Sequence, residues 1–232
     1  MSIAAFVCLV VTTVFAQAET TTQNASAPQK MTGAPYLLDV CAVSGEKLPG
    51  DGGVVLIMDG KTDALQTGRE VRFCCKGCQG AFSKDPAKFI PKIDELIIAD
   101  QMPRYPKSVP CIVMTDELLP DPTGKDARDC KMIVTRNRLV RLCCGKCVRM
   151  FKRDPAKYIE VLDVAVITEA KAAGKIKTCA TNGRPLGDRA NWFVLGDRAL
   201  ATCCKGCQPK AIANPRATFA RVDAAQKSGT DT

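Results

Sequence analysis

The sequence predicts an α+β fold of three tandem small modules, each a β-hairpin followed by two helices. A Cys-Cys-x-x-Cys cluster occurs three times, and a lone cysteine precedes each copy. The clusters comprise Cys74, Cys75 and Cys78; Cys143, Cys144 and Cys147; and Cys203, Cys204 and Cys207. The upstream cysteines are Cys41, Cys111 and Cys179, at spacings of 70 (111 − 41) and 68 (179 − 111) residues. Self-similarity at a near-constant period indicates a repeat architecture.

The composition indicates small modules that need covalent or metal staples. Only 5% of the 232 residues are aromatic, and modules with few aromatics bury little apolar surface. The chain has 14 cysteines and no histidine. The lack of histidine excludes Ser-His and Cys-His catalysis by this chain acting alone. A thiol–disulfide oxidoreductase is the remaining enzyme reading, but the order of elements has no thioredoxin-like βαβ pattern, so we expect no enzyme.

The N-terminus predicts export. Residues 1–18 resemble a signal peptide, because the apolar run 3–15 is followed by Ala16-Gln17-Ala18, a small-x-small cleavage site. The run is short for a bilayer span, and a short membrane anchor is the alternative. Residues 19–34 are rich in Thr, Gln, Ala and Ser and predict a disordered tether. We therefore expect a periplasmic or secreted protein with no membrane span after signal removal.

The cysteine count bears on how the thiols are used. Removing Cys8 with the signal leaves 13 (14 − 1), which is three sets of four plus Cys130. An oxidising compartment usually means disulfides, but an odd number of cysteines cannot pair fully within one chain. The count favours three four-thiol sites, although three disulfide-linked modules would give the same number.

The first module is expected over residues 35–101. A run of β-branched apolar residues predicts the first strand, and a segment of alternating polar and apolar residues predicts the strand that pairs with it. Asp85-Pro86 predicts a helix start, with Asp as N-cap and Pro in the first turn. Apolar residues at helical spacing continue the second helix. The expected elements are strands at 54–58 and 70–73 and helices at 75–84 and 86–99.

The second module is expected over residues 102–174 and the third over 175–228. Asp154-Pro155 repeats the helix start of the first module, and Gly174 ends that helix. The third module has Asn214-Pro215 at this place, and it has Ala211 where the other two have Phe82 and Phe151, so its first helix should be looser. The expected hairpin strands are 132–135 with 139–142, and 192–195 with 199–202.

The cysteine spacing suits a metal. Cys74 and Cys78 are four residues apart and Cys75 and Cys78 three apart, spacings that share one face of a helix. A helix N-terminus also stabilises thiolates. A turn cysteine facing a helix start is how treble-clef zinc modules build their sites, so we expect treble-clef-like modules. All-sulfur ligation suits Zn(II) or Cu(I), one ion per module and up to three in all.

A family resemblance follows from these residues. The segment 41–46, Val71-Arg72-Phe73-Cys74, Cys78, Phe82 and the segment 85–89 together resemble the YHS/TRASH domains, which are small heavy-metal-handling modules. The family pattern is one upstream Cys and a later Cys-x-x-x-Cys followed by Phe and Asp-Pro. Carried over, the resemblance implies three ligand sets: Cys41, Cys74 and Cys78; Cys111, Cys143 and Cys147; and Cys179, Cys203 and Cys207.

The second cysteine of each cluster departs from the family pattern. Cys75, Cys144 and Cys204 could each close a four-sulfur site, leave a three-coordinate Cu(I) site open, or form a disulfide. Three methionines, Met58, Met114 and Met132, could assist copper, although methionine on apolar strands is more often core. The residues leave both questions open.

Two functions fit these observations. The first is an exported protein that sequesters or delivers Cu(I) or Zn(II), with a metal-donor or acceptor protein as partner. The second is a structural or interaction protein whose cysteines only staple the fold through zinc or disulfides, as closed four-cysteine zinc sites usually do. A formal charge of +9 permits nucleic-acid binding. Export and the lack of aromatic-basic interleaving count against it, so we expect no nucleic-acid partner.

Overall fold

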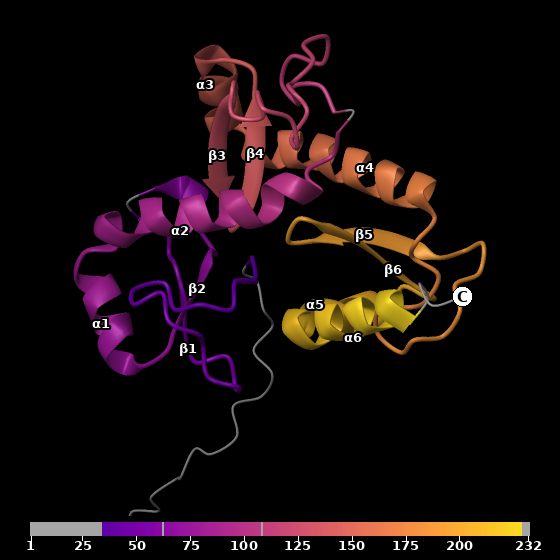
Figure 1. Cartoon of the computed structure of the whole chain (residues 1–232), viewed down its shortest axis with the longest axis horizontal. Helices are drawn as coiled ribbons and strands as arrows, with labels where there is room; N and C mark the ends of the chain where they lie inside the picture. The colour runs from indigo at the N-terminus through magenta and orange to yellow at the C-terminus, as the bar shows by residue number, and fades with distance from the viewer. Residues whose placement is uncertain (1–33, 62, 108, 229–232) are drawn as a thin grey trace, which may run out of the picture.

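The fold is mixed α+β, with three small antiparallel hairpins and six α-helices among the residues described (Figure 1). The structure is a computed structural model, and it describes residues 34–61, 63–107 and 109–228. The expected signal peptide, including Cys8, and the expected tether up to residue 33 lie outside the described residues. Ala34 pairs in parallel with Arg69 as an isolated bridge.

The chain passes three times through the same order of elements, a hairpin and then two helices. Unit 1 comprises β1 (Val54–Ile57), β2 (Glu70–Phe73), α1 (Lys76–Lys84) and α2 (Pro86–Gln101). Unit 2 comprises β3 (Lys131–Thr135), β4 (Arg138–Leu142), α3 (Gly145–Arg153) and α4 (Pro155–Ala173). Unit 3 comprises β5 (Asn191–Leu195), β6 (Arg198–Thr202), α5 (Cys207–Ala213) and α6 (Pro215–Ser228). Short 3-10 turns, η1 (Ala64–Gln66) and η2 (Met102–Arg104), join elements around unit 1.

Local sequence signals set the helix ends. Asp85 and Asp154 are N-caps, and each side chain accepts a hydrogen bond from the backbone N–H three residues on, at 3.3 Å. Gly174 has φ +62°, the left-handed conformation that ends α4 and that glycine adopts without a steric cost. These three predicted boundaries are confirmed. Helix α5 is shorter than α1 and α3, with 7 residues against 9 in each.

Each hairpin delivers the start of a cysteine cluster at the end of its second strand. In unit 2, Lys131 pairs with Leu142 and the turn is made by Arg136 and Asn137, with φ of 49° and 61°. Two positive φ values define the type I′ turn, whose twist matches the flanking strands. Cys143 then follows β4 directly, as Cys74 follows β2.

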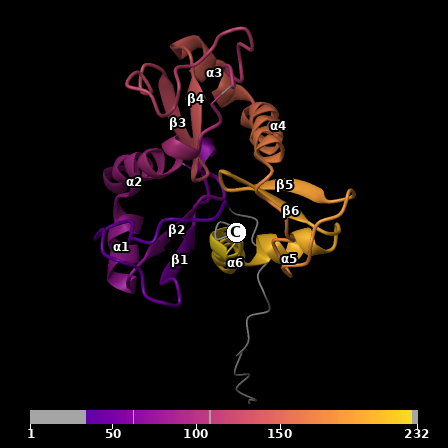
Figure 2. The same ribbon diagram turned by 45° about the vertical axis from the view of Figure 1, so that its right-hand side comes forward.

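The second helix of units 1 and 2 packs on the hairpin of the following unit. Helix α2 contacts β3 and β4, and α4 contacts β5 and β6. Helix α6 returns to the start of unit 1, where the Arg216 guanidinium donates to the carbonyls of Tyr36 and Leu38 and pairs with Asp39. The three units therefore form a closed ring, with the hairpins toward three corners (Figure 2).

The apolar core is divided unequally among the units. One cluster of buried side chains runs through units 1 and 2, from Tyr36 to Leu162, and a separate smaller cluster, from Ala180 to Val222, lies in unit 3. Units 1 and 2 thus share one core, while unit 3 has its own. Within the described ranges, no helix has the length and apolar character required to cross a membrane.

Candidate metal centres

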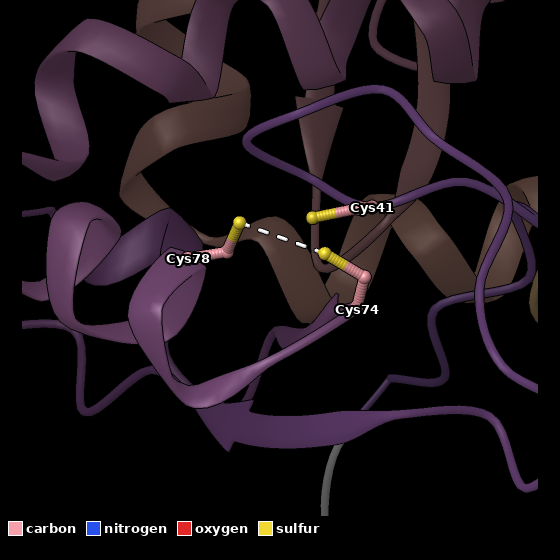
Figure 3. A group of neighbouring side chains, drawn as sticks. All are labelled: Cys41, Cys74 and Cys78. Carbon is pink, nitrogen blue, oxygen red and sulfur yellow. Dashed lines mark hydrogen bonds between the residues drawn. The ribbon is translucent and has the colours of Figure 1, made fainter.

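Three cysteine sulfurs meet in each unit. The groups are Cys41, Cys74 and Cys78; Cys111, Cys143 and Cys147; and Cys179, Cys203 and Cys207, and within each group all sulfurs lie within 4.8 Å of one another. Figure 3 shows the first group, with Cys41 approaching from a loop and Cys74 and Cys78 from the end of β2 and the start of α1. In every unit a cysteine at least 24 positions upstream (203 − 179 in unit 3) thus converges with the cluster on one point.

A tight turn holds the upstream cysteine of each unit in place. The backbone N–H of Cys41 donates to the Glu46 carbonyl at 2.7 Å, and Cys179 makes the same bond to Arg184, also at 2.7 Å. The next residue is tied to the hairpin, because the N–H of Ala42 donates to the Arg72 carbonyl at 3.0 Å. Backbone bonds therefore fix this sulfur against the strand that ends at the cluster.

The sulfur spacing fits a thiolate-bound ion. Paired sulfurs of the downstream cysteines lie 3.6 Å apart in unit 1, 3.5 Å in unit 2 and 3.8 Å in unit 3. Zn–S bonds of about 2.3 Å in a tetrahedron separate the sulfurs by about 3.8 Å. The donors are all sulfur, which soft ions prefer and which Mg and Ca do not. The three groups could therefore hold up to three soft metal ions.

The second cysteine of each cluster lies at the edge of its group. Cys75, Cys144 and Cys204 are exposed, and none belongs to the set of sulfurs that are mutually within 4.8 Å. Cys144 nevertheless lies 3.7 Å from the Cys147 sulfur, and the matching distance in unit 3, between Cys204 and Cys207, is 3.6 Å.

The predicted placement of these cysteines on one face of a helix is wrong in one respect. Helix α1 begins at Lys76, so that Cys74 and Cys75 both precede it, and Cys75 is its N-cap with extended φ of −155°. Cys144 is likewise the extended N-cap of α3, whereas in unit 3 the helix begins only at Cys207. The first two cysteines of a cluster therefore point in directions set by the strand end rather than by helical periodicity. Cys130 belongs to none of the groups, and its sulfur lies 3.8 Å from the Ala127 carbonyl.

Hydrogen bonds favour a thiolate on the upstream cysteine. Burial opposes ionisation of Cys41, but the Ser44 hydroxyl and nearby backbone N–H groups outweigh it and lower the pKa to about 6. Burial also opposes ionisation of Cys179 and Cys111, and backbone N–H donors again outweigh it. They lower the pKa of Cys179 to about 7 and also lower that of Cys111. The upstream cysteine of each unit is therefore buried and yet ionises more readily than an ordinary thiol.

In each unit at least one of the downstream thiols has a raised pKa and keeps its proton when no cation is present. The hydrogen bond with Cys74, together with burial, raises the pKa of Cys78 to about 12. Burial is the main reason that the pKa of Cys143 is raised to about 11. Contacts with Cys204 and burial raise the pKa of Cys207 to about 12. Several thiolates in one small space repel one another, so a cation is the group that would let them ionise together.

The residue beneath each group is apolar, as expected. Phe82 and Phe151 are buried, and the Phe82 ring lies 5.3 Å from that of Phe73 between centroids. Ala211 occupies this place in unit 3 and is also buried. The interpretation of both phenylalanines as core is confirmed.

Two polar side chains that the sequence did not predict lie beside the sulfurs. The Ser44 hydroxyl lies 3.7 Å from the Cys74 sulfur, and the Asn182 amide donates to the Cys203 sulfur at 3.7 Å. Both stand three residues after the upstream cysteine and directly before a glycine. That shared position was the available signal.

The fold and the three sulfur groups define a cysteine-rich α+β repeat protein in which each repeat could bind one metal ion. Comparison with protein-family models, with curated proteins and with solved structures finds no match to this chain.

Proposed function

We propose that this chain is an exported metal-binding protein that sequesters or delivers Cu(I) or Zn(II) through one cysteine site per unit. The observation that carries the proposal is the threefold recurrence of a three-sulfur group, each between a turn and the end of a hairpin. One such group could form by chance packing of apolar cysteines, but three at matching places indicate a selected arrangement.

The family proposed is the YHS/TRASH group, with treble-clef-like modules over residues 35–101, 102–174 and 175–228. The support is the turn–hairpin–helix order around each sulfur group and the Asp-Pro start of α2 and α4. A periplasmic or secreted location rests on the residues of the N-terminal signal. The lack of histidine and the repetition of the same site favour a binding role over an enzymatic one.

The proposed function is tested by metal stoichiometry together with a count of free thiols. The mature chain, purified without oxygen, should retain two or three Cu(I) or Zn(II) ions in native mass spectrometry. Alkylation after metal removal should then find the cluster cysteines reduced. A metal-free protein whose clusters are joined in disulfides would contradict the proposal.

A structural role for the ions is the second candidate, because the sulfurs belong to the core. Cys41, Cys111 and Cys147 are each at most 1% exposed and lie inside the apolar cluster that joins units 1 and 2. An ion bound there would hold the fold together directly. Transfer rates distinguish the two roles. Rapid transfer to a competing thiol chelator without unfolding supports delivery, and exchange only on unfolding supports a staple.

A further inference from the structure

One position near each sulfur group has the same backbone role in every unit. It is the third residue after the upstream cysteine: Ser44, Met114 and Asn182. The backbone N–H of each donates to the sulfur of the upstream cysteine in its own unit. The side chain of this residue therefore starts from an equivalent point at all three groups.

This equivalence holds although the turn of unit 2 is longer. The Cys111 N–H donates to the Glu117 carbonyl, six residues on, whereas that of Cys41 donates to Glu46, five residues on. Since the N–H of Met114 still reaches the Cys111 sulfur, the extra residue lies after Met114. Met114 is therefore the true counterpart of the other two residues.

The three side chains at this position differ in chemistry. The Ser44 hydroxyl forms a hydrogen bond with the Cys74 sulfur at 3.7 Å, in which either group can be the donor. The Asn182 amide donates to two sulfurs, Cys203 at 3.7 Å and Cys207 at 3.9 Å. Met114 is half-buried against the core and carries a thioether, which has no proton to donate. Two groups thus receive a side-chain hydrogen bond, and in unit 2 the equivalent turn position carries a thioether side chain that packs against the core.

These differences have a direct effect on metal preference. Hydrogen bonds to thiolates offset negative charge and orient the ligands, whichever thiophilic ion is held. A thioether instead offers a neutral, polarizable donor, which suits Cu(I) better than Zn(II). We propose that this position sets the metal preference of each unit and that Met114 makes unit 2 the preferred Cu(I) site of the chain. The inference rests on the proposed metal-binding function and deepens it.

The test uses the full mature chain, reduced and metal-free, with Cu(I) supplied at one equivalent under argon. Cysteines left unprotected are then alkylated and assigned by peptide mass spectrometry. Protection should fall first on Cys111, Cys143 and Cys147. Met114→Leu keeps the apolar volume and removes only the sulfur, and it should weaken Cu(I) binding at unit 2 by about 10-fold while Zn(II) binding stays within about 2-fold.

Ser44→Met provides the reciprocal test, because it should raise the share of the first Cu(I) equivalent that unit 1 takes. Protection spread evenly over the three units, or a Met114→Leu distribution equal to the wild type, would overturn the inference and leave the proposed function standing. If neither ion protects any unit, the proposed function itself fails. Circular dichroism of both variants checks that folding is retained.

Discussion

At the scale of single residues, the thiols of one unit fall into two kinds. Cys144 illustrates the exposed kind, since it caps α3 and receives the backbone N–H of Cys147, which lowers its pKa to about 7. The N-terminus of a helix stabilises negative charge through such N–H groups. Cys147, three residues further on, illustrates the buried kind. Its pKa is raised mainly by burial and also by the hydrogen bond with Cys143.

Alkylation of Cys144 in the metal-free protein should follow its lowered pKa. Below pH 7 the thiol is protonated and unreactive, so the rate should rise as the pH passes through about 7 and then level off. In the urea-unfolded chain the same peptide should show its rise near about pH 8.5, the ordinary value for cysteine. Iodoacetamide labelling followed by peptide mass spectrometry measures both curves, and coincident curves would contradict the expectation.

The buried phenylalanine beneath unit 2 gives a second prediction at this scale. Phe151 is 0% exposed and packs with Tyr158, at 6.3 Å between ring centroids. Phe151→Ala should lower the free energy of unfolding by about 3–5 kcal/mol, from lost burial and the cavity left behind. Urea denaturation measures the change, and Lys152→Ala at the neighbouring exposed position should alter it by less than about 0.5 kcal/mol.

At the scale of elements, the β3–β4 turn inserts into unit 1. The Asn137 amide donates to the carbonyls of Glu70 at 2.7 Å and Ala34 at 3.2 Å, and its oxygen accepts from Arg69 at 2.8 Å. Gln101, at the end of α2, donates to the Asn137 carbonyl at 2.8 Å. One side chain thus bonds three polar groups of unit 1 across the interface between the units.

Asn137→Gly separates this docking from the turn itself. Glycine adopts the positive φ of the turn without strain, so the hairpin should persist while the bonds to unit 1 are lost. We expect a loss of about 1–3 kcal/mol in the free energy of unfolding, measured by urea denaturation, because buried groups are left unpaired. Arg136→Gly, at the exposed position of the same turn, should cost less. Equal effects would show that the docking bonds contribute little.

Local signals predicted the elements but not how the units meet. The hairpin strands lie within one residue of the expected ranges, because alternation and turn residues act over a few neighbours. Arg69 and Asn137 show no such pattern, and their meeting depends on tertiary packing across 68 residues. At the site, spacing brought out the three-sulfur groups. It did not reveal that Cys75 precedes its helix, nor the role of Ser44.

At the scale of the whole molecule, stability is distributed unevenly around the ring. Units 1 and 2 share a core, and within unit 1 the buried Arg69 guanidinium pairs with the half-buried Asp94 at 2.7 Å. Unit 3 relies on the smaller cluster around Leu200 and Phe219, with Ala211 in place of the larger ring. A bound ion would therefore contribute the largest share of stability in unit 3.

Removing metal should release unit 3 first. Hydrogen exchange of the metal-loaded chain, followed after addition of a chelator, should show β5, β6 and α5 losing protection before the elements of units 1 and 2. The reason is that local opening follows the regions with the least buried apolar contact. A uniform loss around the ring would contradict this order.

The return of α6 to unit 1 bears on self-association. An array in which every long helix docks on the following hairpin has complementary ends, and such head-to-tail contacts grow into filaments unless the rotation closes. Here Arg216 meets Tyr36, Leu38 and Asp39 of the same polypeptide. The start of α6 therefore covers the segment before β1 of its own chain, and a second copy would have to displace this contact before it could dock there head-to-tail.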